Sequence, residues 1–308
     1  MEFAVFIFLK LIALFSFVVL GFVSRRFIGI DRLAISQLVF YIISPIVFFQ
    51  AIAKLNPEVE IFVLPLVTAS ISSILAILIF LSTKGFVKDT TRAIFSFIST
   101  NSNVGYFLLP IVWELFDDVA AGIFVVMVIG NNIYENTVGF FIAARGKFSL
   151  KESLLKLLKL PAFYAMIFGF TFSVVDCLSI PAMFNDAILS VKGAYSTLGM
   201  MIIGFGLADI KNFKLDFSFI ISSFIVKFLF WPGLTLGFIY LDQNVIHFFD
   251  PIVYKMLILF SVAPLAANNI VIATVLELHP EKVAASVFLS TIFAIFYVPL
   301  VIALFKLG

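Results

Sequence analysis

The fold is decided by residues 91–115, which read TRAIFSFISTNSNVGYFLLPIVWEL. The stretch is long and apolar enough to cross a membrane, for which an α-helix needs about 20 mostly apolar residues. Its centre, however, carries the polar run from Thr100 to Gly105, and Pro110 follows soon after. Glycine weakens a helix, and proline has no backbone N–H to donate. The sequence therefore predicts a membrane-spanning helix that is interrupted near its middle.

A second interrupted span lies in residues 252–276, where the run from Ala263 to Asn269 reads APLAANN. Unpaired backbone groups in hydrocarbon cost several kcal/mol each, so such breaks persist only where protein or a water-filled cavity covers them. Matched interruptions in two halves of a chain are a sequence signal for a substrate site near the membrane midplane. We therefore expect the two broken helices to cross at such a site.

The composition agrees with a membrane protein. Hydrophobic residues make up 63% of the 308 residues and charged residues only 12%, whereas soluble domains carry about 25% charged residues. The net charge of +2 gives no reason to expect a nucleic-acid partner. Cys177 is the single cysteine, and the two histidines lie far apart in the sequence. We therefore expect no disulfide, no metal site and no cofactor.

Eight further segments are apolar over a similar length, so the chain is expected to be an all-α membrane protein with ten transmembrane helices. The expected spans are residues 3–23, 33–53, 60–82, 91–115, 120–142, 161–179, 186–208, 216–240, 252–276 and 282–306.

The distribution of lysine and arginine predicts the orientation, because cytoplasmic loops carry an excess of both. With the N-terminus outside, the cytoplasmic loops hold 14 of the 20 basic residues, the outer loops hold 4, and Lys10 and Lys227 fall inside spans. We therefore expect a multi-pass protein of the plasma, or inner, membrane with both termini on the outer side. Cys177 should then lie near the outer face.

The chain divides into two repeats. Residues 114–121 (ELFDDVAA) and 277–285 (ELHPEKVAA) match with one gap, and each follows an interrupted span. The predicted repeats are residues 1–145 and 161–308, with five spans each. An odd number of spans inverts the second repeat, which is an arrangement typical of secondary transporters. Residues 146–160 are expected to form a cytoplasmic linker helix in the lipid headgroup region.

The candidate substrate-binding residues come from the two breaks and from the fifth span. They are Asn101, Ser102, Asn103, Gly105, Asn131, Asn132, Pro264, Asn268 and Asn269. The half-helices after the breaks begin with free N–H groups and a positive dipole end, which favours an anion. The structural alternative is that the asparagines only pair between helices and hold the bundle together.

Glu135 and Lys227 are charged residues inside expected spans. Such residues are functional candidates, and they usually pair with each other. We therefore consider Glu135 and Lys227 a candidate charge pair or coupling site. The alternatives are a purely structural ion pair, or a Lys227 that neutralises the negative C-terminal ends of the half-helices.

Four short motifs occur in order along the chain. They are Leu38-Val39-Phe40-Tyr41 with Pro45 after the Arg25-Arg26 loop, Ser102-Asn103-Val104-Gly105-Tyr106 with Pro110, Gly130-Asn131-Asn132, and Pro264 with Ala266-Ala267-Asn268. These motifs resemble those of the auxin efflux carrier family, which also includes bacterial malate permeases. Leu108 and Leu265 depart from the family pattern, which has glycine and a second proline at these places. The departures are expected to change the shape of the crossover and hence which acid fits.

The resemblance implies ten helices in an inverted repeat. It implies a scaffold of helices 1, 2, 6 and 7 and a mobile transport domain of helices 3–5 and 8–10. It also implies carboxylate substrates bound where helices 4 and 9 cross.

The function expected from the residues and the resemblance together is secondary transport of a small carboxylate, malate-like or auxin-like, by alternating access. A proton or sodium gradient is the candidate energy source, and a homodimer is a candidate assembly. One alternative is a sodium-coupled symporter of the bile-acid type, although the crossover holds no carboxylate to bind sodium. An intramembrane enzyme would need an acid–base set or metal ligands at depth, and Glu135 alone does not supply one. We therefore do not expect an enzyme.

Overall fold

The computed structural model describes residues 2–56, 58–144, 158, 160–175, 180–209 and 215–307. These residues are mostly helical and contain no β-strand. Seven helices are long and apolar enough to cross a membrane, namely Leu11–Ile28, Arg32–Ala53, Val59–Ser82, Asp118–Ala143, Ala182–Ala208, Phe217–Ile246 and Pro280–Leu304. Shorter apolar helices are Val104–Leu115, Pro161–Val174 and Pro251–Ser261. The all-helical membrane class is therefore confirmed, while the ten-helix inverted repeat stays a prediction.

Both predicted interruptions are present. In the first, α5 (Asp89–Thr100) ends, and a π-helical turn η3 (Val104–Leu108) leads into α6 (Leu109–Leu115). In the second, α14 (Pro251–Ser261) ends and α15 (Asn268–Val275) begins six residues after Val262. Residues 101–103 and 262–267 are therefore the non-helical links.

Several long helices contain a π-helical turn, in which the backbone is wider than in an α-helix. In the first such helix, the turn η2 (Val39–Ile43) joins α2 (Arg32–Leu38) to α3 (Ser44–Ala53). In the second, η4 (Glu135–Gly139) joins α7 (Asp118–Tyr134) to α8 (Phe140–Ala143). In the third, η6 (Val226–Phe230) joins α12 (Phe217–Ile225) to α13 (Trp231–Leu241). The hydroxyl of Ser44 donates to the carbonyl oxygen of Val39 at 2.7 Å, five residues back. That bond spans the widened turn.

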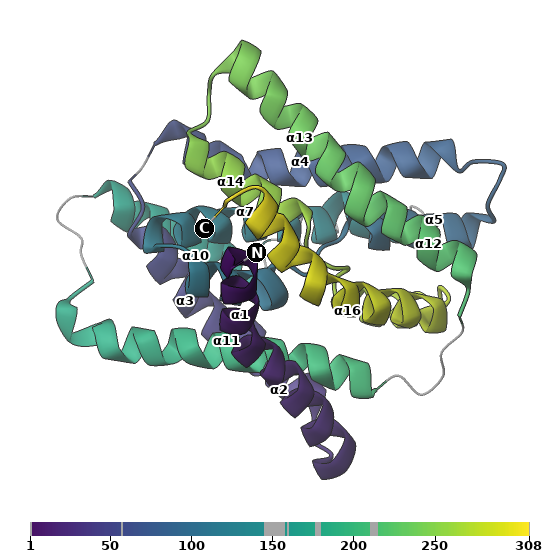
Figure 1. Cartoon of the computed structure of the whole chain (residues 1–308), viewed down its shortest axis with the longest axis horizontal. Coiled ribbons are helices and arrows are strands. Elements are labelled where there is room, and N and C mark those ends of the chain that lie inside the picture. Colours follow the sequence, from purple (N-terminus) through teal and green to yellow (C-terminus); the bar gives the residue numbers. More distant parts are fainter. Residues whose placement is uncertain are drawn as a thin grey trace.

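The helices pack into two groups. The first helix group contains α1 (Glu2–Val23), α2, α3, α10 (Pro161–Val174) and α11 (Asn185–Ala208), in which α1 packs on α11 and α3 packs on α10. The second helix group contains α4 (Val59–Ser82), α5 to α8 and α12 to α16, the last being Pro280–Leu304. Here α4 packs on α7, and α12 and α15 pack on α16. The two groups also contact each other, among other places where α3 meets α7 and where α1 meets α16. In Figure 1, α2, α3 and α11 of the first group lie in the lower part of the view, and α4, α13 and α14 of the second group lie in the upper part.

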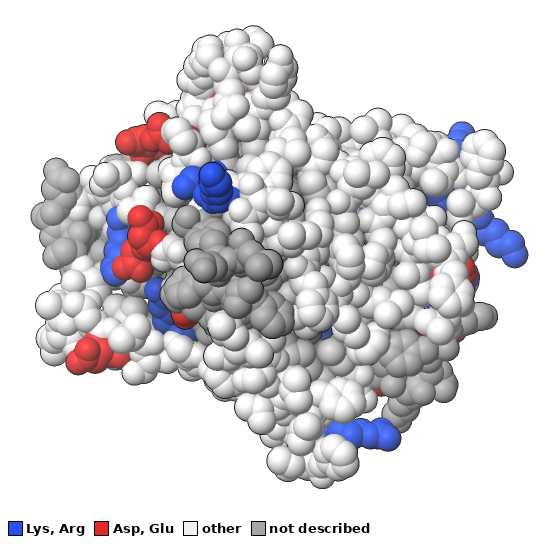
Figure 2. Space-filling view, viewed as in Figure 1, with Lys and Arg blue, Asp and Glu red and all other residues white. Residues whose placement is uncertain are grey.

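The charged residues are unevenly distributed over the surface. In Figure 2 they gather mainly towards the two ends of the long axis, and the surface between them is largely uncharged. Large apolar side chains such as Val19 and Leu66 are exposed. Charges are costly at the centre of a bilayer, so this distribution is that of a chain crossing the membrane along its long axis.

Two predictions concern residues that the structure does not describe. Cys177 lies outside the described residues, and so does the expected linker 146–160 apart from Leu158 and Leu160.

Close approach of α1 and α11 depends on glycine. A methyl group built on Gly204 would fall on the backbone oxygen of Val18 and the backbone nitrogen of Phe22. A methyl group on Gly21 would likewise meet the backbone of Met201. Small residues allow helices to pack this closely in a membrane, where van der Waals contact rather than the hydrophobic effect holds them together.

Replacing Gly204 by alanine is expected to destabilise the protein by about 1–3 kcal/mol, the usual cost of overpacking, because the methyl group meets backbone that cannot rotate away. Gly193→Ala, on the same helix, has open space at its Cβ and is the matched control. Thermal unfolding in detergent measures both variants. Equal melting temperatures would mean that α1 and α11 do not depend on this contact.

Candidate functional site

The two breaks pair with each other through their backbones. The amide of Asn103 donates to the carbonyl oxygen of Pro264 at 2.8 Å, and the amide of Ala266 donates to the carbonyl oxygen of Asn101 at 3.1 Å. Ser102 and Leu265 lie opposite each other in this short antiparallel bridge. Backbone groups that have no helical partner in one break therefore form hydrogen bonds with the other break, as their burial requires.

Side-chain amides surround this pairing. Asn101 is fully buried and donates to Asn269 Oδ1 at 2.9 Å and to Glu135 Oε2 at 3.1 Å. Asn131 donates to Asn101 Oδ1 at 3.1 Å and accepts from the amide of Ser102 at 3.4 Å. Asn269 also donates to the carbonyl oxygen of Ile98 at 3.4 Å. The structure thus joins both breaks and the fifth span in one network.

The predicted charge pair is not formed. Lys227 is fully buried on η6, and its amine donates to the hydroxyl of Ser102 and lies over the Trp231 ring at 4.9 Å. Glu135 instead accepts hydrogen bonds from Asn101 and, at 3.5 Å, from Asn268. The pairing hypothesis is wrong for this conformation because neighbouring polar groups of the breaks, Asn101 and Ser102, satisfy each charge separately.

Three supporting residues were not predicted from the sequence. The indole of Trp231 donates to the carbonyl oxygen of Thr100 at 3.3 Å, at the end of α5. The Tyr134 hydroxyl hydrogen-bonds the Thr100 hydroxyl. The Ser290 hydroxyl accepts from the amide of Leu265 at 3.2 Å. All three lie on apolar helices. The signal for them in the sequence is a side chain that can form a hydrogen bond within an otherwise apolar segment, since such a group needs a partner when it is buried.

A pocket of about 580 Å³, including its open mouth, lies beside the paired breaks. On one side it is lined by residues of the first helix group, namely Phe40, Ser44, Phe48, Ala162 and Tyr195. On the other side it is lined by residues of the second helix group, namely Ser102, Asn103, Val104, Gly105, Tyr106, Val128, Asn131, Asn132, Glu135, Ala266, Ala267 and Asn268. The pocket is therefore polar at the breaks and largely apolar and aromatic opposite them.

The predicted site residues separate into two sets. Seven of them line the pocket, namely Ser102, Asn103, Gly105, Asn131, Asn132, Asn268 and Glu135. Asn101, Pro264, Asn269 and Lys227 lie behind that surface and hold the breaks together. A methyl group on Gly105 would come within 3.2 Å of the Tyr195 hydroxyl, so this glycine lets the first break approach α11.

Asn103 carries an unused hydrogen-bond donor. The side chain is buried, it lines the pocket, and its Nδ2 atom has no hydrogen-bond partner. A buried donor without a partner costs about 1–3 kcal/mol, and such groups are rare in native structures. A group that accepts a hydrogen bond in the pocket would remove this cost.

Helix starts also face the pocket. The π-helical turn η3, which continues into α6, begins at Val104, and α15 begins at Asn268. Both residues line the pocket. The start of a helix carries a partial positive charge, so two such starts in one pocket favour a negatively charged group.

Comparison with known proteins places the chain in a family. None of the curated proteins compared with the chain matches it. A family model described as a membrane transport protein matches residues 6–302, nearly the whole chain. The interrupted helices, the pocket between two helix groups and this match agree, and the chain belongs to the auxin efflux carrier-type family of membrane transport proteins.

Proposed function

We propose that the chain is a secondary transporter that carries a small carboxylate through the pocket beside the paired breaks. The observation that carries the proposal is the unpartnered amide nitrogen of Asn103 in a pocket where two helices begin. A carboxylate is an acceptor for that nitrogen, and its charge is favoured by the helix starts. The family match supports transport itself.

Ser102 and Lys227 support the choice of an anion. Ser102 lines the pocket and accepts a hydrogen bond from the Lys227 amine. Its own hydroxyl proton is therefore directed away from Lys227 and is available for a substrate oxygen. A protonated Lys227 adds positive charge directly behind the pocket, where the low dielectric strengthens its effect.

The position of the pocket supports alternating access. Its walls come from both helix groups, so a displacement of one group against the other would expose it to opposite sides of the membrane. We propose that the first helix group is the scaffold and the second moves with the substrate. The same proposal includes the inverted repeats of residues 1–145 and 161–308 and both termini on the outer side.

Glu135 is the proposed coupling residue. Its carboxylate lines the pocket and accepts hydrogen bonds from Asn101 and Asn268. An ionised Glu135 would repel a bound carboxylate, so uptake of a proton would favour substrate binding. This supports a proton rather than a sodium gradient as the energy source.

The rival functions find less support. A bile-acid-type symporter needs several oxygen ligands around sodium, and the side-chain oxygens of Asn101, Asn131 and Asn269 at the breaks already accept hydrogen bonds. An enzyme would need a positioned acid–base pair, and the described residues that line the pocket offer one carboxyl group, that of Glu135, with no histidine, lysine or cysteine beside it.

Replacing Asn103 by alanine is expected to weaken substrate affinity roughly 10- to 150-fold, since a hydrogen bond to a charged group contributes about 1.5–3 kcal/mol. Asn268→Ala should act in the same direction. Asn103→Asp should be worse than Asn103→Ala, because a carboxylate there repels an anion. The measurement is uptake of a panel of labelled mono- and dicarboxylates into proteoliposomes, with and without pH and sodium gradients.

The matched control for these variants is Asn136→Ala. The Asn136 amide donates to the carbonyl oxygen of Asn132 within its own helix, and Asn136 does not line the pocket. Uptake at the wild-type level in both Asn103→Ala and Asn268→Ala would remove these residues from the substrate site. No uptake of any carboxylate by the wild-type protein would contradict the proposed substrate class.

Replacing Glu135 by glutamine is expected to preserve substrate exchange but to abolish acceleration by an imposed proton gradient. Glutamine keeps an oxygen acceptor for Asn101 and imitates the protonated acid. Because Lys227 is not paired with Glu135, Lys227→Met should not restore the lost coupling. Gradient-driven uptake unchanged from the wild-type protein would exclude Glu135 as the coupling residue.

Replacing Ser102 by alanine removes the acceptor of the Lys227 amine and is expected to lower stability by about 1–3 kcal/mol. The Lys227→Met/Ser102→Ala double variant should lose less than the sum of the two single variants. Ser99→Ala is the matched control, because that buried hydroxyl has no hydrogen-bond partner. Thermal unfolding in detergent compares them, and equal losses for Ser102→Ala and Ser99→Ala would argue against the Lys227 bond.

A further inference from the structure

Asp118 joins the two helix groups through two lysines. Its Oδ2 atom lies 2.7 Å from the Lys54 amine and its Oδ1 atom lies 3.4 Å from the Lys192 amine. Asp118 belongs to the first turn of α7 in the second helix group, whereas Lys54 caps the end of α3 and Lys192 is part of α11, both in the first helix group. One carboxylate therefore bridges two helices of the opposite group.

The helix ends favour this arrangement. A carboxylate is stabilised at the start of a helix and a lysine at the end of one, so Asp118 on α7 and Lys54 on α3 both suit their positions. Lys192 also lies over the Trp113 ring of α6 at 5.2 Å, and Trp113 packs edge-on against Tyr195 of α11 at 5.4 Å. The contact between the groups at this end thus combines charge and aromatic packing.

The two groups are closely packed directly beneath Asp118. A methyl group on Gly122, one turn further along α7, would come within 2.6 Å of the Leu55 side chain and 2.8 Å of the Ala51 backbone oxygen. Ala51 and Leu55 are both buried. Phe48 and Val128, further along the same two helices, line the pocket, so the route between α3 and α7 from the Asp118 end is closed in this structure.

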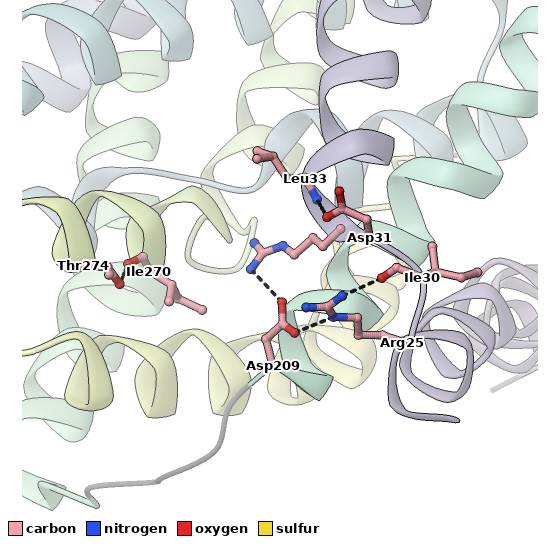
Figure 3. A network of polar contacts seen from close by, with 8 residues as sticks. Arg25, Ile30, Asp31, Leu33, Asp209, Ile270 and Thr274 are labelled. Carbon is pink, nitrogen blue, oxygen red and sulfur yellow. Dashed lines mark hydrogen bonds and ion pairs between the residues drawn. The ribbon is translucent and has the colours of Figure 1, made fainter. Parts of the chain in front are cut away.

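The ion pairs at the opposite end are different. Arg25 donates to Asp209 at 2.6 Å and to the carbonyl oxygen of Ile30, all within the first helix group (Figure 3). Lys282 pairs with Asp216 at 2.7 Å within the second helix group. These pairs hold each group together and do not join one to the other. The pocket reaches towards this end at Ala162, which is the second residue of α10.

We propose that Asp118, Lys54 and Lys192 form an ionic latch that keeps the pocket closed at the Asp118 end. The latch must open when the second helix group moves, so it sets how often the pocket opens to that side of the membrane. The proposal rests on the proposed alternating access. It does not depend on the identity of the substrate.

The test follows the accessibility of a cysteine beneath the latch. Ala51→Cys is introduced together with Cys177→Ser, and a membrane-impermeant maleimide is applied to sealed vesicles of either orientation. Asp118→Asn should raise the labelling rate from the Asp118 side about twofold to fivefold, the range expected for loss of surface ion pairs. Lys54→Gln/Lys192→Gln should raise it equally, and the triple variant should add nothing further.

Asp117→Asn is the matched control. Asp117 is the neighbouring carboxylate, but it caps α7 by accepting from the amide of Ala120 at 2.8 Å, and it forms no ion pair with a described residue. Its replacement should leave labelling unchanged. Equal labelling of wild-type, Asp118→Asn and Lys54→Gln/Lys192→Gln proteins, or an equal rise in Asp117→Asn, would overturn the latch.

A measurement without latch variants completes the test. Salt screens exposed charges, so raising ionic strength should increase labelling of Ala51→Cys in the otherwise wild-type protein towards the Asp118→Asn rate. No effect of salt would count against the latch. Because labelling needs no substrate, a failure here is distinguishable from a failure of carboxylate transport.

Discussion

The backbone pairing between residues 101–103 and residues 264–266 is the constraint on which the rest of the site depends. Each broken helix leaves amide and carbonyl groups without helical partners, and hydrocarbon offers none. Pro264 contributes only its carbonyl oxygen, which accepts from the amide of Asn103. In the other direction, the amide of Ala266 donates to the carbonyl oxygen of Asn101. Neither break can pair its own backbone amide and carbonyl groups, so the two broken helices have to meet.

The asparagine network follows from that meeting. Once the breaks are paired, the amide side chains of Asn101, Asn131 and Asn269 lie close enough to satisfy one another. Burial makes each of these bonds stronger and each unfilled partner more costly. Against this background the open Nδ2 atom of Asn103 is exceptional, and it lies where the pocket begins. A site whose buried asparagines are paired except for the Nδ2 atom of Asn103 is suited to a ligand that supplies the missing acceptor.

Much of this architecture was accessible from the sequence because its signals are local. The polar run at Thr100 to Gly105 and the proline at 264 predicted both interruptions, and hydrophobicity predicted the membrane-spanning class. The partners of the charges were not accessible in this way. Glu135 and Lys227 were the obvious pair by charge. In the structure, however, the Lys227 amine donates a hydrogen bond to the Ser102 hydroxyl, and the Glu135 carboxylate accepts one from the Asn101 side-chain amide. Which buried group is nearest depends on helix rotation, which composition does not encode.

The hydrogen-bond partners of Trp231 and Ser290 could not be predicted from the sequence either. Each is one of several residues able to hydrogen-bond on an apolar helix, and only the position of the breaks identifies which carbonyl or amide it meets. The division of the asparagines into pocket-lining and supporting residues has the same origin. Asn101 and Asn103 have different roles because the chain between them is not helical, whereas Asn268 and Asn269 are neighbours on α15 and project from different sides of it.

The π-helical turns have a consequence for how related chains are aligned. A wide turn holds one residue more than an α-turn, and each residue rotates a helix by about 100°. Phe40, Tyr106, Glu135 and Lys227 all belong to such turns. A relative that lacks the extra residue would present the helix beyond the turn on a different face, although its hydrophobic pattern would look unchanged. Aligning this chain with such a relative would need a single-residue gap inside a helix rather than in a loop.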